Sequence, residues 1–126
     1  MTIKEVSSMF DLSQDTLRFY EKKGLIGPIM KTSGGIRNYS DNDLKRIEFI
    51  KCMRGAGLPV DVLKKYVDLF EMGDASLDER RKILEEQKEI LKEKIDRMQE
   101  AYDKLTYKIN LYNSGDLEKL LDSSNK

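Results

Sequence analysis

The side chain with the most reactive chemistry in this sequence is Cys52, the only cysteine among 126 residues. It lies in the segment RIEFIKCMRGAGL, beside Lys51 and close to Arg54. Neighbouring positive charges favour the thiolate, which is the form that attacks an electrophilic carbon. The sequence contains no histidine, so neither a Ser-His-Asp nor a Cys-His arrangement can form within the chain. These residues predict a reactive thiol without the partners of a catalytic one.

Cys52 also has a second interpretation, because it stands among Phe49, Ile50 and Met53. A lone cysteine between large apolar residues is commonly a small buried hydrophobe. A single cysteine permits no intramolecular disulfide, and without histidine the chain cannot build a Cys/His zinc cluster. We therefore expect no metal and no cofactor, and the residues alone leave the role of Cys52 open.

A second group of candidate residues is the run LRFYEKKG, in which Arg18 stands beside Phe19 and Tyr20. The chain has 23 basic and 23 acidic residues, but residues 18–54 hold nine Lys or Arg against four acids. A basic region with aromatic residues, in a chain that is neutral as a whole, is typical of proteins that bind nucleic-acid phosphates. On charge alone, a chance fluctuation explains the pattern equally well.

The N-terminal residues predict two short helices joined by a tight turn. Thr2 and Glu5 have the spacing of a capping box for the first helix. Ser13 is suited to cap the second helix, and Gly24 is suited to end it. Two short helices joined in this way form a helix-turn-helix.

Two short extended runs follow, on either side of Ser33-Gly34-Gly35. This pattern favours a β-hairpin with a polar tip. A hairpin after a helix-turn-helix is a wing, and this one carries Lys31 and Arg37 and ends at Tyr39, three residues suited to contact phosphate.

Two more helices are predicted after the wing. Ser40 is suited to cap the first, which runs to Gly55 or Gly57, and Pro59 is suited to begin the second. The helical pattern then breaks at Gly73. We therefore predict a winged helix-turn-helix domain over residues 1–73.

Residues 74–114 predict one long helix, because no glycine or proline occurs between Ser76 and Gly115. Ser76 and Glu79 have the spacing of another capping box. Apolar residues then recur with the alternating spacing of a coiled coil, which requires a partner helix, most simply a second copy of the chain. The predicted dimerisation seam consists of Leu77, Leu84, Leu91, Ile95, Met98, Tyr102, Leu105, Ile109 and Tyr112. The alternative to a coiled coil is a helix that packs back on its own domain. Residues 115–126 predict a short helix and a frayed tail.

Together, TLRFYEKKGLIGP and GIRNYSDNDLKRIEFIK resemble the MerR family of bacterial transcription regulators. The resemblance covers residues 1–73 and extends to the long helix in length and role. It implies a mainly α fold, in which a winged helix-turn-helix head is followed by a helix that dimerises as an antiparallel coiled coil. It also implies double-stranded promoter DNA as a partner, with the second helix in the major groove. The residues implied to contact DNA are Ser13, Thr16, Arg18, Tyr20, Lys31, Arg37, Tyr39 and Arg54, whereas Phe19 is expected to point inward.

The resemblance further implies a mechanism and a stimulus. In such a regulator, the activated homodimer bends and untwists a promoter spacer that is too long for RNA polymerase. Metal-sensing members carry cysteines around the long helix, and this chain has none there. The flanks of Cys52 resemble the aldehyde- and thiol-reactive subgroup, the AdhR- and NmlR-like regulators, whose members carry a cysteine in this helix. A small reactive aldehyde or another electrophile sensed at Cys52 is therefore the implied signal.

Other functions stay open on the sequence. A thiol enzyme such as a peroxidase would use Cys52 without a histidine partner, and a pure interaction protein would work through the coiled coil alone. A MerR-type regulator with another inducer, or with none, would keep Cys52 as a structural core residue. The sequence shows neither an apolar run long enough to span a membrane nor a signal peptide. We expect a cytoplasmic regulator that is not an enzyme.

Overall fold

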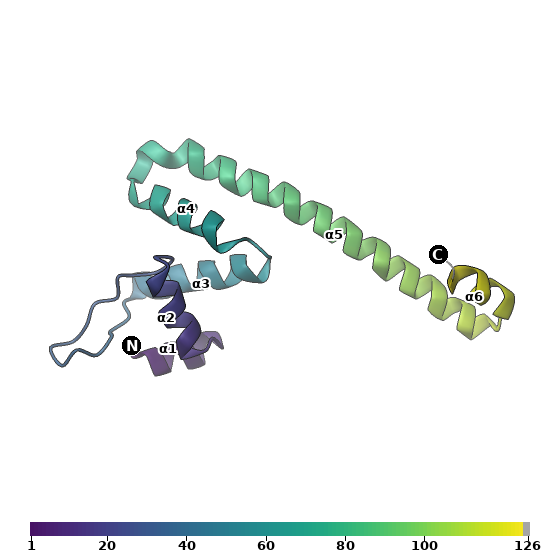
Figure 1. Cartoon of the computed structure of the whole chain (residues 1–126), viewed down its shortest axis with the longest axis horizontal. Coiled ribbons are helices and arrows are strands. Elements are labelled where there is room, and N and C mark those ends of the chain that lie inside the picture. The colour runs from purple at the N-terminus through teal and green to yellow at the C-terminus, as the bar shows by residue number, and fades with distance from the viewer. Residues whose placement is uncertain (125–126) are drawn as a thin grey trace. The chain divides into compact units, whose positions relative to one another are not determined.

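The structure, a computed structural model, describes residues 1–124 (Figure 1). Its helices are α1 (Ile3–Phe10), α2 (Gln14–Lys22), α3 (Asp41–Gly55), α4 (Val60–Glu71), α5 (Leu77–Ser114) and α6 (Leu117–Ser124), with a 3-10 turn, η1 (Gly73–Ser76), before α5. The predicted mainly α fold is confirmed. Asn125 and Lys126, the end of the predicted frayed tail, lie outside the described residues. Over the described part of the chain, no helix is long and apolar enough to cross a membrane.

The chain divides into two compact units, Met1–Gln87 and Lys88–Lys126, and the division falls inside α5. The first turns of α5 therefore belong with α1 to α4, beyond the boundary placed at Gly73 from the sequence. We call Met1–Gln87 the head. The residue at which the DNA-binding domain ends stays a prediction.

The helix-turn-helix forms because each of its helices has a polar cap. The hydroxyl of Thr2 accepts a hydrogen bond from the Glu5 N–H at 3.2 Å, and the Glu5 carboxylate accepts one from the Thr2 N–H at 2.9 Å, so the capping box is confirmed. Helix α1 ends at Asp11, whose φ of 53° is left-handed. The Ser13 hydroxyl then accepts a hydrogen bond from the Thr16 N–H at 3.0 Å and caps α2. These local bonds fix where α2 begins.

One apolar core holds the head together, and α1 to α4 all contribute to it. The most deeply buried apolar side chains, each at most 1% exposed, are Val6, Leu17, Leu25, Ile26, Ile47, Ile50 and Leu63. Full burial of a side chain of this size stabilises the fold by roughly 1.5–3 kcal/mol. The core therefore fixes α2 against α3 and α4 and leaves the opposite face of α2 in solvent.

The predicted wing lies between α2 and α3, but its two runs pair less than expected. Among the described residues they form a single antiparallel bridge, between Lys31 and Arg37, and no named strand. Two hydrogen bonds accompany it, from the Thr32 N–H to the Ile36 carbonyl at 2.7 Å and from the Asn38 N–H to the Met30 carbonyl at 2.8 Å. The hairpin is therefore present, although its own backbone ladder is minimal.

The predicted capping box at Ser76 is wrong. The Ser76 side chain is 2% exposed. Its hydroxyl donates toward the carbonyls of Leu69 and Gly73, the latter at 2.8 Å, and does not cap a backbone N–H at the start of α5. It also accepts a hydrogen bond from Nε of Arg80 at 3.0 Å. The 3-10 turn explains the difference, because it carries Ser76 back over the end of α4.

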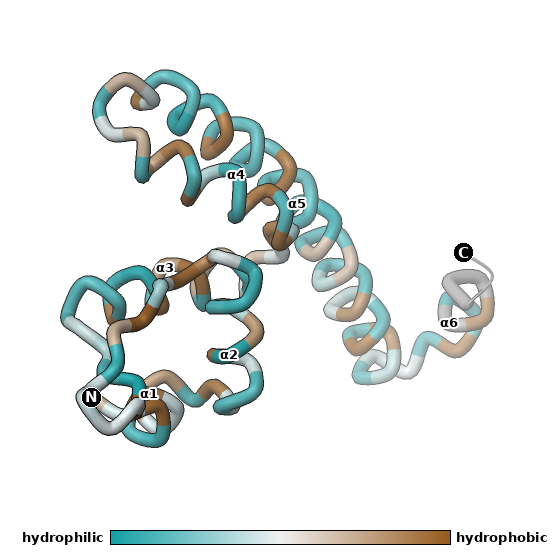
Figure 2. Tube along the Cα trace, turned by 60° about the vertical axis from the view of Figure 1, so that its left-hand side comes forward, coloured by the Kyte–Doolittle hydropathy of each residue, from teal (hydrophilic) through white to brown (hydrophobic). Residues whose placement is uncertain are grey.

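Helix α5 spans 38 residues, in which apolar and polar positions alternate along the tube (Figure 2). Most of its apolar side chains are exposed: Leu77, Leu84, Ile90, Ile95, Met98, Tyr102, Leu105, Tyr107, Ile109 and Tyr112 are each at least 37% exposed. Leu111, at 7%, is the buried exception, next to the turn into α6. The seam predicted from the sequence is thus exposed in the single chain, except for Leu91, which is half-buried.

Replacing Leu17 by Ala should lower the free energy of unfolding by about 2–5 kcal/mol, because it leaves a cavity between the helices of the head. Urea denaturation followed by circular dichroism, at one fixed protein concentration, measures this loss. Met9→Ala is the matched control, since Met9 is 55% exposed, and it should shift the free energy by less than about 0.5 kcal/mol. Equal losses in the two variants would contradict the assigned core.

Candidate nucleic-acid interface

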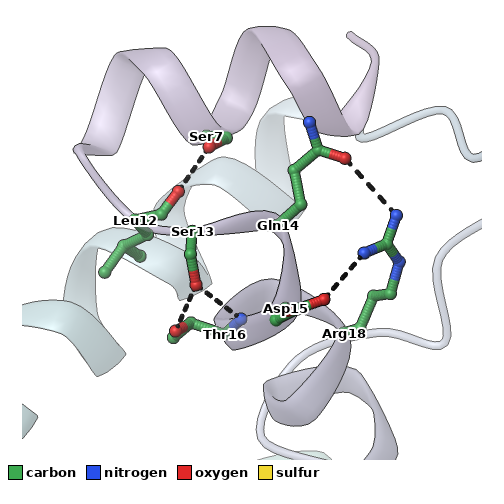
Figure 3. A network of polar contacts seen from close by, with 7 residues as sticks. All are labelled: Ser7, Leu12, Ser13, Gln14, Asp15, Thr16 and Arg18. Atoms are coloured by element: carbon green, nitrogen blue, oxygen red, sulfur yellow. Dashed lines mark hydrogen bonds and ion pairs between the residues drawn. The ribbon is translucent and has the colours of Figure 1, made fainter.

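The exposed face of α2 begins with a group of polar side chains (Figure 3). The hydroxyls of Ser13 and Thr16 lie 2.8 Å apart. Arg18 lies on the same helix, where its guanidinium donates to Asp15 at 3.1 Å and to Gln14 at 3.3 Å. Asp15 is 95% exposed, so this pair contributes at most about 1 kcal/mol and a phosphate or base edge can displace it. Arg18 can thus exchange its internal partners for a nucleic acid with little loss of free energy.

An ion pair between Glu21 and Arg37 connects α2 to the wing. Nε of Arg37 lies 2.8 Å from the Glu21 carboxylate, and both side chains are partly shielded, at 32% and 18% exposed. The hydrogen bond that Arg37 donates to Glu21 raises the pKa of the Arg37 guanidinium above its ordinary value. Within the described residues, the two terminal nitrogens of Arg37 make no hydrogen bond, so they can still meet a phosphate.

The two tyrosines predicted to contact DNA are core residues in this chain. Tyr20 is 6% exposed and Tyr39 is 3% exposed, and both belong to the core cluster of the head. The Tyr39 hydroxyl is the one buried side-chain polar atom without a partner among the described residues. Burial raises the pKa of this hydroxyl above its usual value. A DNA contact by Tyr39 would therefore require local movement, and for both residues the contact stays a prediction.

The expectation that Phe19 points inward is wrong. Phe19 is 41% exposed, and Nζ of Lys23 lies 5.8 Å from its ring centroid. The reason is helical geometry, because Leu17 and Tyr20 share the buried face of α2 and the two residues between them turn outward. An exposed aromatic ring with a cation above it therefore extends the surface that carries Arg18.

Lys31 and Arg54 lie in different surroundings from the α2 residues. Lys31 is exposed on the wing and carries no side-chain bond among the described residues. Arg54 is exposed at the end of α3, where its guanidinium donates to the Leu58 carbonyl at 2.8 Å. Arg54 therefore also stabilises the turn between α3 and α4. Whether either residue contacts DNA stays a prediction.

Cys52 is exposed on α3, so its interpretation as a buried hydrophobe is wrong for this chain. The thiol is therefore reachable from solvent. Lys51 and Arg54 each donate to a backbone carbonyl, of Phe10 and Leu58 respectively. No cluster of metal-ligating side chains occurs among the residues that the structure describes.

Comparison with known proteins identifies the family to which this geometry belongs. The profile described as "MerR HTH family regulatory protein" matches residues 1–69, which is more than half of the chain. The chain belongs to the MerR family. A second profile, "MerR, DNA binding", matches residues 44–107 and so includes much of α5. This MerR-type chain is a DNA-binding transcriptional regulator and not an enzyme.

Individual relatives agree with the family in sequence and in structure. The chain is 48% identical to the transcriptional regulator AdhR of Bacillus subtilis over 84 residues, which are 67% of this chain and 60% of AdhR. A MerR family regulator from Listeria monocytogenes superposes with a TM-score of 0.87 at 41% identity, over 97% of this chain and 95% of that one. HiNmlR, described as a MerR family regulator lacking the sensor domain and bound to promoter DNA, superposes with a TM-score of 0.80 at 27% identity, over 92% of each chain.

Because Cys52 is exposed, we expect one thiol per chain to react with a disulfide reagent in native buffer. The measurement is the rate of thiol release with Ellman's reagent, for the native chain and for the chain in urea. The native rate should approach the denatured one, and Cys52→Ser should not react. Reaction only after unfolding would contradict the exposed position of this side chain.

Proposed function

We propose that two copies of this chain pair through α5 and bind one promoter, whose spacer they distort for RNA polymerase, in response to a reactive aldehyde or another electrophile at Cys52. The observation that carries the proposal is the surface formed by α2 and the wing. There Arg18 has only a weak internal partner, and Glu21 holds Arg37 close to the recognition helix. The cell compartment that we propose is the cytoplasm.

Support for a dimer comes from the exposed apolar seam of α5. Met98, Tyr102, Leu105 and Tyr112 are each at least 63% exposed. A helix of 38 residues is about 57 Å long. An apolar stripe of this length in water favours pairing with another helix, and the heptad spacing suits a second copy of α5. An antiparallel pair would hold two heads apart on the DNA.

For the DNA contacts, we propose a division between phosphate contacts and base contacts. Ser13, Thr16 and Arg18 lie on the exposed side of α2, which would enter the major groove. Lys31 and Arg37 would contact the phosphate backbone from the wing, and such contacts fix the register of the protein on the duplex. HiNmlR, which resembles this chain, is described as bound to promoter DNA.

Distortion of the promoter would follow from the separation of the two heads. Bending a site of 20–30 base pairs costs of order 1–6 kcal/mol, so a modest change in the dimer can decide whether the spacer is bent. This energy is comparable to that of a few hydrogen bonds to charged groups. A chemical change in the head that alters a few such bonds would therefore be large enough to switch the promoter.

Sensing at Cys52 is supported by its exposure and by the likeness to AdhR. The exposed thiolate would attack the carbonyl carbon of a small aldehyde to form a hemithioacetal, in which the former carbonyl oxygen takes up a proton. Since the thiol is exposed in the single chain, the adduct would change the surface that α3 presents to another molecule. The alternative is a MerR-type regulator with another inducer, in which Cys52 has no sensing role.

Replacing Cys52 by Ser should abolish activation by aldehyde while leaving DNA binding intact. The measurement is transcription from a promoter that the chain binds, with purified RNA polymerase, with and without methylglyoxal, and with DNA binding measured in parallel. Wild type should activate on addition of the aldehyde and Cys52→Ser should not, because serine is a far weaker nucleophile. If both proteins respond alike to the aldehyde, sensing at Cys52 is excluded. If the wild-type chain does not bind DNA at all, its proposed role as a promoter-binding regulator is excluded.

A further inference from the structure

A cavity of about 600 Å³ opens on the head between the first half of α3 and the second half of α4. Its size falls in the range of small-molecule sites, which is roughly 300–1,000 Å³. Asn42, Arg46 and Phe49 line it from α3, and Tyr66, Phe70 and Glu71 line it from α4. Gly27, which lies between α2 and the wing, also lines the cavity, whereas Cys52 does not.

Aromatic rings form the apolar part of this cavity. Phe49 and Tyr66 stack with their ring centroids 5.3 Å apart and an angle of 29° between the rings. Phe70 is 48% exposed, although an aromatic side chain of this size normally gains stability from burial. Three aromatic rings therefore line the cavity, and one of them, Phe70, is half exposed to solvent.

Positive charge gathers at the half-exposed ring of Phe70. The guanidinium carbons of Arg46 and Arg80 lie 5.1 Å and 5.0 Å from the Phe70 centroid. Arg46 pairs with Glu71 at 3.1 Å, whereas Arg80 donates to the Ser76 hydroxyl and to the Gly73 carbonyl. In the described part of the chain, Arg80 has no carboxylate partner.

The acids of the cavity only partly offset this charge. Asp43 and Glu71 line the cavity, against the positive charges of Lys45 and Arg46 in the lining and of Arg80 beside Phe70. The Asp43 carboxylate also accepts a hydrogen bond from the Ser40 N–H at 2.8 Å in the cap of α3. Glu71 is 66% exposed, so its pair with Arg46 is worth at most about 1 kcal/mol and can be exchanged for another anion. Lys45 also lines the cavity and makes no ion pair within the described residues.

We propose that this cavity binds a small aromatic carboxylate. The ring of the ligand would lie against Phe49, Tyr66 and Phe70, and its carboxylate would take the place of Glu71 on Arg46, near the charge of Arg80. A flat ring stacks on exposed aromatic faces, and a guanidinium binds a carboxylate through two parallel hydrogen bonds. This proposal does not rest on the proposed function, because the head alone would bind the ligand and no DNA is needed.

The test is a titration of the full-length, ¹⁵N-labelled chain with 2-naphthoate, followed by amide chemical shifts without DNA. We expect saturable shifts in residues 42–49 and 66–71. Arg46→Gln should weaken binding about tenfold, because a charge-assisted hydrogen bond is lost. Arg81→Gln is the matched control, since Arg81 is a surface arginine with an ion pair to Asp78 on α5. Its affinity should equal that of the wild type.

A second pair of variants tests the aromatic part of the site. Phe70→Leu keeps an apolar side chain but removes the ring, and it should also weaken binding. Phe19→Leu removes a comparable exposed ring that also has a cation over it, outside the cavity, and should have no effect. The neutral analogue 2-naphthamide should bind more weakly than 2-naphthoate. Shifts confined to α5, no saturation, equal affinity in Arg46→Gln and Arg81→Gln, or equal binding of the amide would overturn the proposal.

Discussion

The ion pair between Glu21 and Arg37 determines whether α2 and the wing act as one surface. Few interactions within the wing stabilise it, since its two runs share one bridge and Met30 and Ile36 are 78% and 61% exposed. Tyr39, at the base of the wing, is buried in the core, so the base is fixed while the tip projects. The Glu21 carboxylate, 2.8 Å from Arg37, is the side-chain link from the projecting part to the recognition helix. Through this link, the exposed Arg18 and the partly shielded Arg37 belong to one surface.

Much of the fold could be predicted from local patterns, whereas this link could not. The caps at Thr2 and Ser13 are short-range and need only a polar residue before an amphipathic stretch, so the helix-turn-helix was predictable. Glu21 and Arg37 are 16 residues apart on two different elements, and no periodicity connects them. Their pairing depends on how the core places the wing beside α2. An acid among basic residues at a predicted interface was the one available signal.

The predictions for Phe19, Ser76 and Cys52 that the structure contradicts failed for a similar physical reason. Phe19 and Tyr20 are neighbours, and only the three-residue spacing from Leu17 decides that Tyr20 turns inward. A hydroxyl-bearing ring is easily assigned to the surface, but tertiary packing determines which face of α2 is covered. Ser76 has the sequence spacing of a cap, yet the 3-10 turn moves its hydroxyl onto the carbonyls at the end of α4. The exposure of Cys52 likewise depends on the packing of α3, which the pattern of apolar neighbours did not reveal.

The most direct test of this account is the affinity of Glu21→Gln for a DNA fragment selected for tight binding by the wild-type chain. Removing a negative charge from a DNA-binding surface should strengthen binding if charge alone matters. Our account predicts the opposite, a loss of up to about tenfold, because the neutral glutamine cannot form the charge-assisted hydrogen bond, worth about 1.5 kcal/mol, that holds Arg37 and the wing. Glu48→Gln on α3 removes the same charge from an exposed side chain and should not weaken binding. Affinity of Glu21→Gln equal to or tighter than that of the wild type would contradict the account.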